Sequence, residues 1–244
     1  MRIQAASALM MMLLGTACGD DDDKMEESST RPSIAVSPLD VAHITAVSKF
    51  RSCSGHDFSP GVKGHGSPDA ERARSMKHYL KTDITLTPAG QVQVVAPIDG
   101  TIDIQNETFD LGKQVYVTSG NWSLRIFHID PTVADGAVVK AGDVIGTIAP
   151  ADAATKLGDQ RGPDGKPPTY EFDIAVTSRD NQQYVSIFEM MDPAVAAQWA
   201  ARGFTRDNTM ISKADRDAMP CALGPDGERF ADQSENPADW VTAL

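Results

Sequence analysis

The clearest alternation of apolar and polar positions lies at residues 169–176, which read TYEFDIAV. Every second side chain is apolar, as on a strand that buries one face of a sheet and exposes the other. The exposed face carries Thr169, Glu171 and Asp173 in a row. Two carboxylates and a hydroxyl lined up in this way can form a functional face or an ordinary solvated surface.

Four more stretches have short apolar runs with polar neighbours, separated by turns rich in glycine, proline or asparagine. They lie at residues 84–104, 113–119, 122–129 and 137–149. Several short strands with turn residues every 8–12 positions or so are typical of an all-β sandwich or barrel. We therefore expect a mainly β domain, with residues 151–168 as a polar loop on its rim.

The flanking regions have a different pattern. Residues 192–204 combine helix formers with a proline near the start and a glycine near the end, which predicts a helix capped at both ends. Residues 212–221 predict a second short helical piece that stops at Pro220. The chain thus predicts a β domain at residues 39–190, beginning with a loop-rich extension with a short helix, and a helical and irregular C-terminal tail at residues 191–244.

The N-terminus predicts export. Residues 5–14 form an apolar run that is too short to span a membrane and fits the core of a signal peptide. Small residues lead into Cys18, so residues 1–18 resemble a lipoprotein signal with Cys18 as the lipidated residue. The alternative is an ordinary cleaved signal with an incidental cysteine. The acidic, Ser- and Thr-containing stretch at residues 19–38 predicts a disordered tether.

Two cysteines remain, Cys53 and Cys221. In an exported protein the simplest use of two such cysteines is one disulfide, which would hold the C-terminal tail near the start of the folded domain. The alternative is two unpaired thiols.

Charge narrows the range of partners. The 244 residues have a formal net charge of −12, with 41% hydrophobic and 23% charged residues, as in a soluble globular protein. So acidic a chain is a poor ligand for nucleic acid or for anionic lipid. We expect no nucleic-acid partner, contact with a membrane only through a lipid anchor, and a monomer.

Three segments in order resemble the LytM/lysostaphin-type zinc endopeptidases, which cut peptidoglycan cross-bridges. VQVVAPIDGTI at residues 92–102 is similar to the family's V-x-A-x-x-D-G-x-V strand-turn-strand. Residues 124–149 are similar to its Y-x-H-L block and the glycine-valine repeat that follows, with His128 at the histidine. TYEFDIAV falls where the family has H-x-H-F-E-V. The resemblance covers residues 79–176 and implies a LytM/lysostaphin-like β domain of the duplicated hybrid motif fold.

The resemblance also implies a zinc site, because the family holds zinc with the histidine and aspartate of H-x-x-x-D and the second histidine of H-x-H. In this register Asp83 stands at the aspartate, Glu171 at the second histidine and Tyr79 at the first ligand. His78 is one residue away from that first position. A set of His78, Asp83 and Glu171 could hold zinc, because carboxylate is an acceptable ligand, and His128 would assist proton transfer or stabilise the oxyanion.

The departures from the family pattern set the functional hypotheses. Thr169 replaces the first histidine of H-x-H and cannot act as a general base. The leading hypothesis is an exported envelope protein with a divergent peptidase domain that binds peptidoglycan or an envelope protein without cutting. The alternatives are an active zinc endopeptidase with these atypical ligands and a non-enzymatic carbohydrate-binding module that uses Trp122.

His56 offers an alternative metal ligand. It lies beside Asp57 in a Gly/Ser-rich loop and could join His78 and Asp83. The simpler interpretation is that Asp57 caps a turn and His56 is a hydrogen-bonding residue of the loop.

Overall fold

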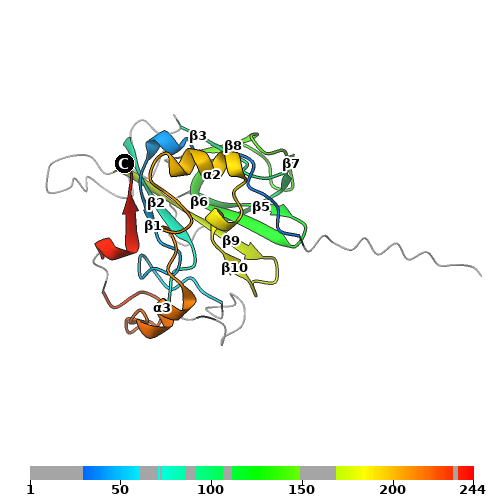
Figure 1. Ribbon diagram of the computed structural model, residues 1–244. Coiled ribbons are helices and arrows are strands. Elements are labelled where there is room, and N and C mark those ends of the chain that lie inside the picture. Colours follow the sequence, from blue (N-terminus) through cyan, green and yellow to red (C-terminus); the bar gives the residue numbers. More distant parts are fainter. Residues whose placement is uncertain are drawn as a thin grey trace, which may run out of the picture.

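One antiparallel sheet forms most of the described structure (Figure 1). The computed structural model describes residues 30–60, 71, 73–85, 92–106, 112–148, 169–232 and 236–244. The expected signal peptide with Cys18 and the expected rim loop at residues 151–168 lie outside these ranges. The mainly β fold class expected from the strand periodicity is confirmed.

The strands follow the order β11-β1-β2-β9-β6-β5-β4-β7, with β10 paired to β9, and β8 paired to both β3 and β6. Every strand pairing in the sheet is antiparallel. The strands are β1 Ile44–Ser48, β2 His78–Thr85, β3 Gln93–Val95, β4 Gly100–Asn106, β5 Lys113–Ser119, β6 Trp122–Pro131, β7 Val138–Val139, β8 Val144–Ile148, β9 Thr169–Ser178, β10 Tyr184–Val185 and β11 Trp240–Thr242.

In the described ranges, two α-helices and three short 3₁₀ helices accompany the sheet. They are η1 Val41–His43, η2 Ile187–Glu189, α2 Pro193–Ala200, α3 Lys213–Ala218 and η3 Pro237–Asp239. Both predicted C-terminal helices are present. Asp192 caps α2 by accepting a hydrogen bond from the Val195 N–H at 3.1 Å, and Ser212 caps α3 by accepting one from the Asp215 N–H at 3.0 Å. None of the described helices is long and apolar enough to cross a membrane.

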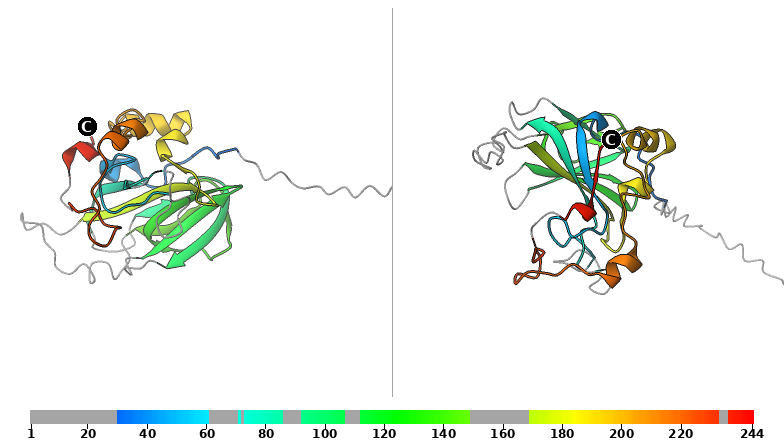
Figure 2. Two further views of the ribbon diagram at one scale, coloured as in Figure 1. Left: turned by 90° about the horizontal axis from the view of Figure 1, so that it is seen from below. Right: turned by 60° about the vertical axis from the view of Figure 1, so that its left-hand side comes forward.

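The main core lies on one face of the sheet, where the helices gather in Figure 2. The alternation on β9 sends Phe172, Ile174 and Val176 into this core, and α2 buries Val195 and Trp199 against it. Trp199 is fully buried and makes an edge-to-face contact with Phe188, at 5.3 Å between ring centroids. Helix α2 is therefore part of the domain core.

The C-terminal region is more integrated than the expected irregular tail. Strand β11 pairs with β1, with Ser48 opposite Trp240, and so adds an edge strand to the sheet. The disulfide predicted between Cys53 and Cys221 is confirmed, with a Cα–Cα distance of 5.5 Å across 168 residues of sequence. A strand of three residues is too short to show periodicity, which is why the sequence did not predict β11.

The expected disordered tether at residues 19–38 does not extend to its C-terminal end. Ile34 is buried in the main core, and its N–H donates to the Met190 carbonyl at 2.7 Å. The residues from Ile34 onward therefore belong to the folded domain. The sequence did not predict this, because the stretch has low hydrophobicity overall and only one of its described side chains, Ile34, joins the main core.

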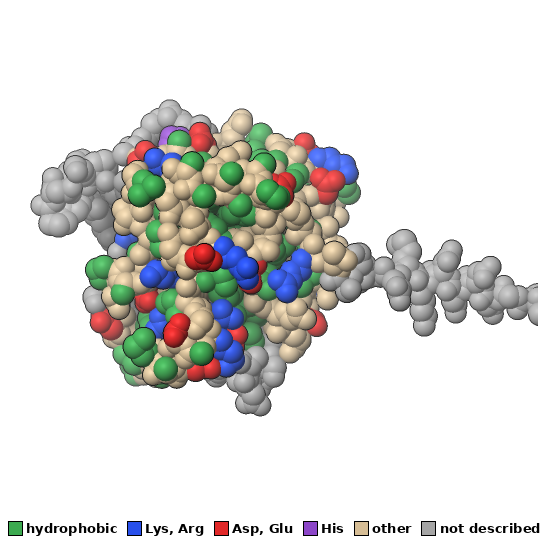
Figure 3. Space-filling model, viewed as in Figure 1, with side chains coloured by type: hydrophobic (Ala, Val, Ile, Leu, Met, Phe, Trp, Pro, Cys, Tyr) green, Lys and Arg blue, Asp and Glu red, His purple; other side chains and the backbone are tan. Residues whose placement is uncertain are grey.

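The surface mixes charges of both signs. On the face shown in Figure 3, Lys and Arg side chains lie next to Asp and Glu side chains. The exposed Lys140–Asp99 pair, at 2.8 Å, is an example of such a surface contact.

Candidate functional site

The face of the sheet opposite the main core carries a buried ion pair. The antiparallel register of β2 and β9 places Tyr79 directly opposite Asp173. Lys77 precedes Tyr79 by two residues and points to the same side, because strand side chains alternate. Its ammonium donates to Asp173 Oδ2 at 2.5 Å, and the two side chains are only 3% and 4% exposed.

A β-bulge turns His128 toward this pair. Between two paired positions, β6 advances three residues, from Ile126 to Ile129, while β5 advances two, from Val115 to Lys113. The extra residue re-aims a side chain. Residue His128 has a φ of +64°, and its Nε2 lies 3.7 Å from Asp173 Oδ2. Left-handed backbone at a non-glycine residue is strained and is found often at functional sites.

An aromatic cluster covers the ion pair. Phe58 packs edge-to-face on Phe127 and Tyr184, with centroid distances of 5.9 and 5.5 Å. The Lys77 ammonium lies 4.6 Å from the centre of the Phe127 ring and 4.5 Å from that of Tyr79, within cation–π range. This second core, formed by Phe50, Phe58, Met76, Phe127, Ala175 and Tyr184, covers part of the face on which the resemblance places the zinc site.

The loop that carries Phe58 is fixed onto the site by its own backbone. Gly55 has a φ of +72°, and a Cβ at this position would lie 2.0 Å from Tyr79 Oη, so only glycine fits. Asp57 accepts hydrogen bonds from Ser59 Oγ at 2.6 Å and from the Ala73 N–H at 3.2 Å. Asp57 thus holds the turn, as the simpler interpretation of the sequence predicted.

Electrostatics keep Lys77 and Asp173 charged. Burial opposes the charge on both groups, but their mutual attraction prevails, so it raises the pKa of Lys77 and lowers the pKa of Asp173. Burial, together with the nearby Lys77 charge, lowers the pKa of the His56 imidazole to about 4. His56 is therefore neutral at pH 7.

The structure does not bring the proposed metal ligands together. His78 and Glu171 point to opposite faces of the sheet. Glu171 pairs with Lys81 and shares its face, and Lys81 lies three residues after His78 on β2, where side chains alternate between the two faces. His78 is buried on the core side. Its Nδ1 donates to the Ser48 carbonyl at 2.8 Å, and its Nε2 lies 2.7 Å from Ser186 Oγ.

The other expected ligands lie on the surface or in the loop. Asp83 is exposed and contacts His43 Nδ1 at 2.9 Å, and Glu171 is also exposed. His56, the alternative ligand, places its Nδ1 3.0 Å from the Asp57 carbonyl oxygen. The prediction that His78, Asp83 and Glu171 coordinate one ion is therefore wrong. The error arose because a position one residue away on a strand lies on the other face.

The residues present do not fit a zinc ion. Within the described ranges, no three His, Cys, Asp or Glu side chains are grouped closely enough to hold a metal. The cation beside Asp173 is the Lys77 ammonium, which would repel a divalent ion at the same carboxylate. Sequence analysis did not single out Lys77, although its two-residue spacing from Tyr79 was a signal that could have indicated it.

Trp122 is not available as a sugar platform. Its side chain is 4% exposed and packs in the main core, with the Arg31 guanidinium 5.4 Å from its ring. The role that the carbohydrate-binding hypothesis gave to Trp122 is therefore excluded by its burial.

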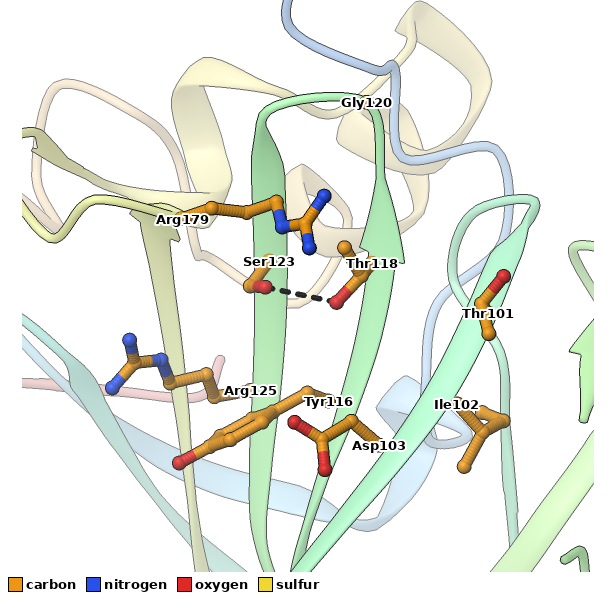
Figure 4. Close-up of a pocket in the computed structure, with 9 residues that line it drawn as sticks. All are labelled: Thr101, Ile102, Asp103, Tyr116, Thr118, Gly120, Ser123, Arg125 and Arg179. Atoms are coloured by element: carbon orange, nitrogen blue, oxygen red, sulfur yellow. Dashed lines mark hydrogen bonds between the residues drawn. The ribbon is translucent and has the colours of Figure 1, made fainter. Parts of the chain in front are cut away.

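An open groove lies next to the aromatic cluster on the same face (Figure 4). Its volume is about 560 Å³, and its floor is made of two rows of cross-strand neighbours. One row is Asp103, Tyr116 and Arg125, and it continues to Ala175 of the cluster. The other row is Thr101, Thr118 and Ser123.

Comparison with known proteins gives structural neighbours only. No protein-family model matches the chain, and no curated protein sequence matches it. Among solved structures, the deep-sea M23 metalloprotease pseudoalterin matches with a TM-score of 0.34 and 14% identity, over 65% of this chain and 76% of that one. The NMR structure of lysostaphin matches with a TM-score of 0.30 and 16% identity, over 54% of this chain and 49% of that one.

A further match is the SpoIIQ–SpoIIIAH pore-forming complex, with a TM-score of 0.41 and 15% identity, covering 67% of this chain and 93% of that one. The structure search thus returns proteins of the LytM/lysostaphin type that the sequence motifs resemble. The chain matches about half the length of lysostaphin and 34% of Helicobacter pylori Csd3.

Proposed function

We propose that this chain is an exported cell-envelope protein whose LytM-like domain binds peptidoglycan without cutting it. The observation that carries the proposal is the buried Lys77–Asp173 pair, which lies on the sheet face where the family resemblance implies a metal. Export is supported by the signal-like N-terminus and by the Cys53–Cys221 disulfide, since disulfides persist in oxidising compartments.

A fixed ammonium cannot supply the chemistry of the family. Zinc peptidases need an open coordination position where a bound water becomes acidic enough to attack a carbonyl. Lys77 is held charged by Asp173, so it acts neither as a general base nor as a nucleophile. Thr169 stands where the family has a histidine, and a hydroxyl does not replace an imidazole in proton transfer near neutral pH.

The groove beside the cluster supplies a surface for binding. It is open and lined mainly by hydroxyl, guanidinium, carboxylate and aromatic groups, which suit a polar polymer of sugar and peptide. Because the cluster closes the neighbouring part of the face, a ligand in the groove would bind without approaching a reactive group. A lipid anchor on Cys18 would keep the domain at the envelope, and this anchor remains part of the proposal.

The test uses the full chain, purified without chelators. We expect less than about 0.1 equivalent of zinc, co-sedimentation with insoluble peptidoglycan, and no release of soluble peptide from it. A lysostaphin-type endopeptidase serves as the positive control for release. Stoichiometric zinc with peptide release would instead favour the active hydrolase, and failure to co-sediment would overturn the association with the wall.

A further inference from the structure

The groove over β4, β5 and β6 contains a buried cation, Arg125, that has no carboxylate partner among the residues that the structure describes. The Arg125 side chain lies in the row between Tyr116 and Ala175, and the residue is 7% exposed. Its Nη2 donates to the neutral amide oxygen of Asn181, and its guanidinium stacks on Tyr116 with its carbon 4.9 Å from the ring centre. Within the described part of the chain, its Nε is buried without a hydrogen-bond acceptor.

A buried guanidinium without a counter-charge is costly, so its presence points to an anion that completes the site. Elsewhere in the described structure the buried cations do have carboxylate partners. Lys77 pairs with Asp173, and Arg216 Nη2 pairs with Asp239 Oδ1 at 3.0 Å. Arg125 lines an open groove instead, where a ligand could supply the missing charge.

A second guanidinium and two hydroxyls define the rest of this end of the groove. Arg179 follows the end of β9, and Figure 4 shows its guanidinium above the Thr118 and Ser123 side chains. Those two hydroxyls lie 2.9 Å apart and hydrogen-bond to each other. Guanidinium groups bind carboxylates with two parallel hydrogen bonds, and hydroxyls can complete the coordination of the oxygens.

Asp103 gives the groove a polarity. It lies opposite Tyr116 on the next strand, on the far side of Tyr116 from Arg125, and it accepts a hydrogen bond from Gln105 Nε2 at 2.7 Å. A second carboxylate of a ligand would be repelled there, whereas an N–H group would be attracted. The acidity of the whole chain disfavours anions at long range, so recognition depends on the local contacts with the two arginines.

We infer that this groove binds a peptide through a free carboxylate held by Arg125, with the Arg179 guanidinium adding positive charge at the same end of the groove and an N–H group of the ligand toward Asp103. The inference rests on the proposed association with peptidoglycan, whose peptides carry free carboxylates, and it names the chemical group that the groove recognises.

The test is an NMR titration of the full chain with three probes: N-acetyl-alanyl-alanine, its C-terminal carboxamide, and acetate. We expect the peptide acid to bind at least about tenfold more tightly than the carboxamide, which lacks the charge, and than acetate, which lacks the peptide. Equal affinities for acid and carboxamide would overturn the carboxylate site, and equal affinities for acid and acetate would overturn peptide recognition.

Two substitutions locate the site. Arg125→Gln should remove the preference for the acid, and Arg179→Gln, at an exposed position whose substitution spares the core, should reduce it at least about threefold. Lys140→Gln, at the exposed Lys140–Asp99 pair, should leave it unchanged. An unchanged preference in the folded Arg179→Gln variant would overturn the role of that arginine.

Sedimentation with peptidoglycan separates this inference from the proposed function. Wild-type protein that sediments with the wall but shows no acid preference would overturn the carboxylate site alone. Protein that prefers the acid but does not sediment would support the site and overturn the association with the wall.

Discussion

The Lys77 ammonium lies 2.5 Å from Asp173 Oδ2 beneath an aromatic cover, on strands that pair Tyr79 with Asp173. The two charges are removed from water together, so each is stabilised mainly by the other. Such a pair contributes little compared with a well-packed apolar replacement, but removal of one partner leaves the other charge buried and uncompensated. The pair therefore makes the fold depend on both residues.

Lys77→Met should lower the free energy of unfolding by about 3–5 kcal/mol, because Asp173 would remain buried without its counter-charge. Urea denaturation monitored by circular dichroism at pH 7 measures this loss. The matched control is Lys140→Met, which breaks the exposed pair with Asp99 and should leave the free energy of unfolding almost unchanged. The double variant Lys77→Met with Asp173→Leu should recover most of the loss, and no recovery would argue against the uncompensated charge as its cause.

The stability of the protein should fall as the pH drops from 6.5 toward 4. Burial lowers the pKa of His78 from its ordinary 6.5 to about 4, so in this window the unfolded state binds a proton that the folded state does not. His78 should contribute a slope of about 1 kcal/mol per pH unit near pH 5. The lowered pKa of Asp173 acts at lower pH, since its stabilisation is lost only as the pH falls below its unfolded value near 4.

Urea titrations at half-unit steps between pH 5 and 8.5 measure this slope. His78→Gln should reduce the slope by about 1 kcal/mol per pH unit, whatever its effect on absolute stability. Above pH 7.5 His78 is neutral in the folded and the unfolded state, so the wild type and the variant should have the same slope there. This range provides an internal control. Identical slopes for wild type and variant would contradict a neutral buried His78.

Local patterns were sufficient for the class of fold, for the C-terminal helices and for the disulfide. The alternation at residues 169–176 correctly assigned Phe172, Ile174 and Val176 to the core face of β9. The proline near the start of α2 likewise predicted that helix, and the two cysteines that remain after Cys18 predicted the disulfide. These features depend on near neighbours or on simple counting.

The site depends on register, which sequence patterns fix poorly. His78 and Tyr79 are adjacent in sequence but lie on opposite faces, so a shift of one residue exchanges a core histidine for a site residue. The turn of His128 toward Asp173 results from a bulge that is defined only by pairing with β5. The partner of Lys77 is 96 residues away, and no local pattern reveals it.

Removal of the disulfide should destabilise the protein strongly. Cys53 and Cys221 are 168 residues apart in sequence, and a long closed loop loses much entropy in the unfolded state. Replacing both cysteines by serine should cost roughly 2–5 kcal/mol of unfolding free energy. Denaturation of wild type with and without reductant, beside the double serine variant, measures the loss; reductant should not affect the variant. A loss below about 1 kcal/mol would contradict the stabilising role of the bond.

Gly55→Ala should test whether the loop must lie directly on Tyr79. The new Cβ would lie 2.0 Å from Tyr79 Oη at a φ of +72°, so the loop must move away from the ion pair that it covers. Gly227→Ala is the matched control, because its φ is +71° but nothing lies within 4 Å of the new Cβ. Backbone strain alone costs about 1–2 kcal/mol, so the control should lose that amount and Gly55→Ala clearly more. Hydrogen exchange should also rise at the amides around Phe58 in Gly55→Ala alone. An equal loss of unfolding free energy in the two variants would show that the loop does not need to lie directly on Tyr79.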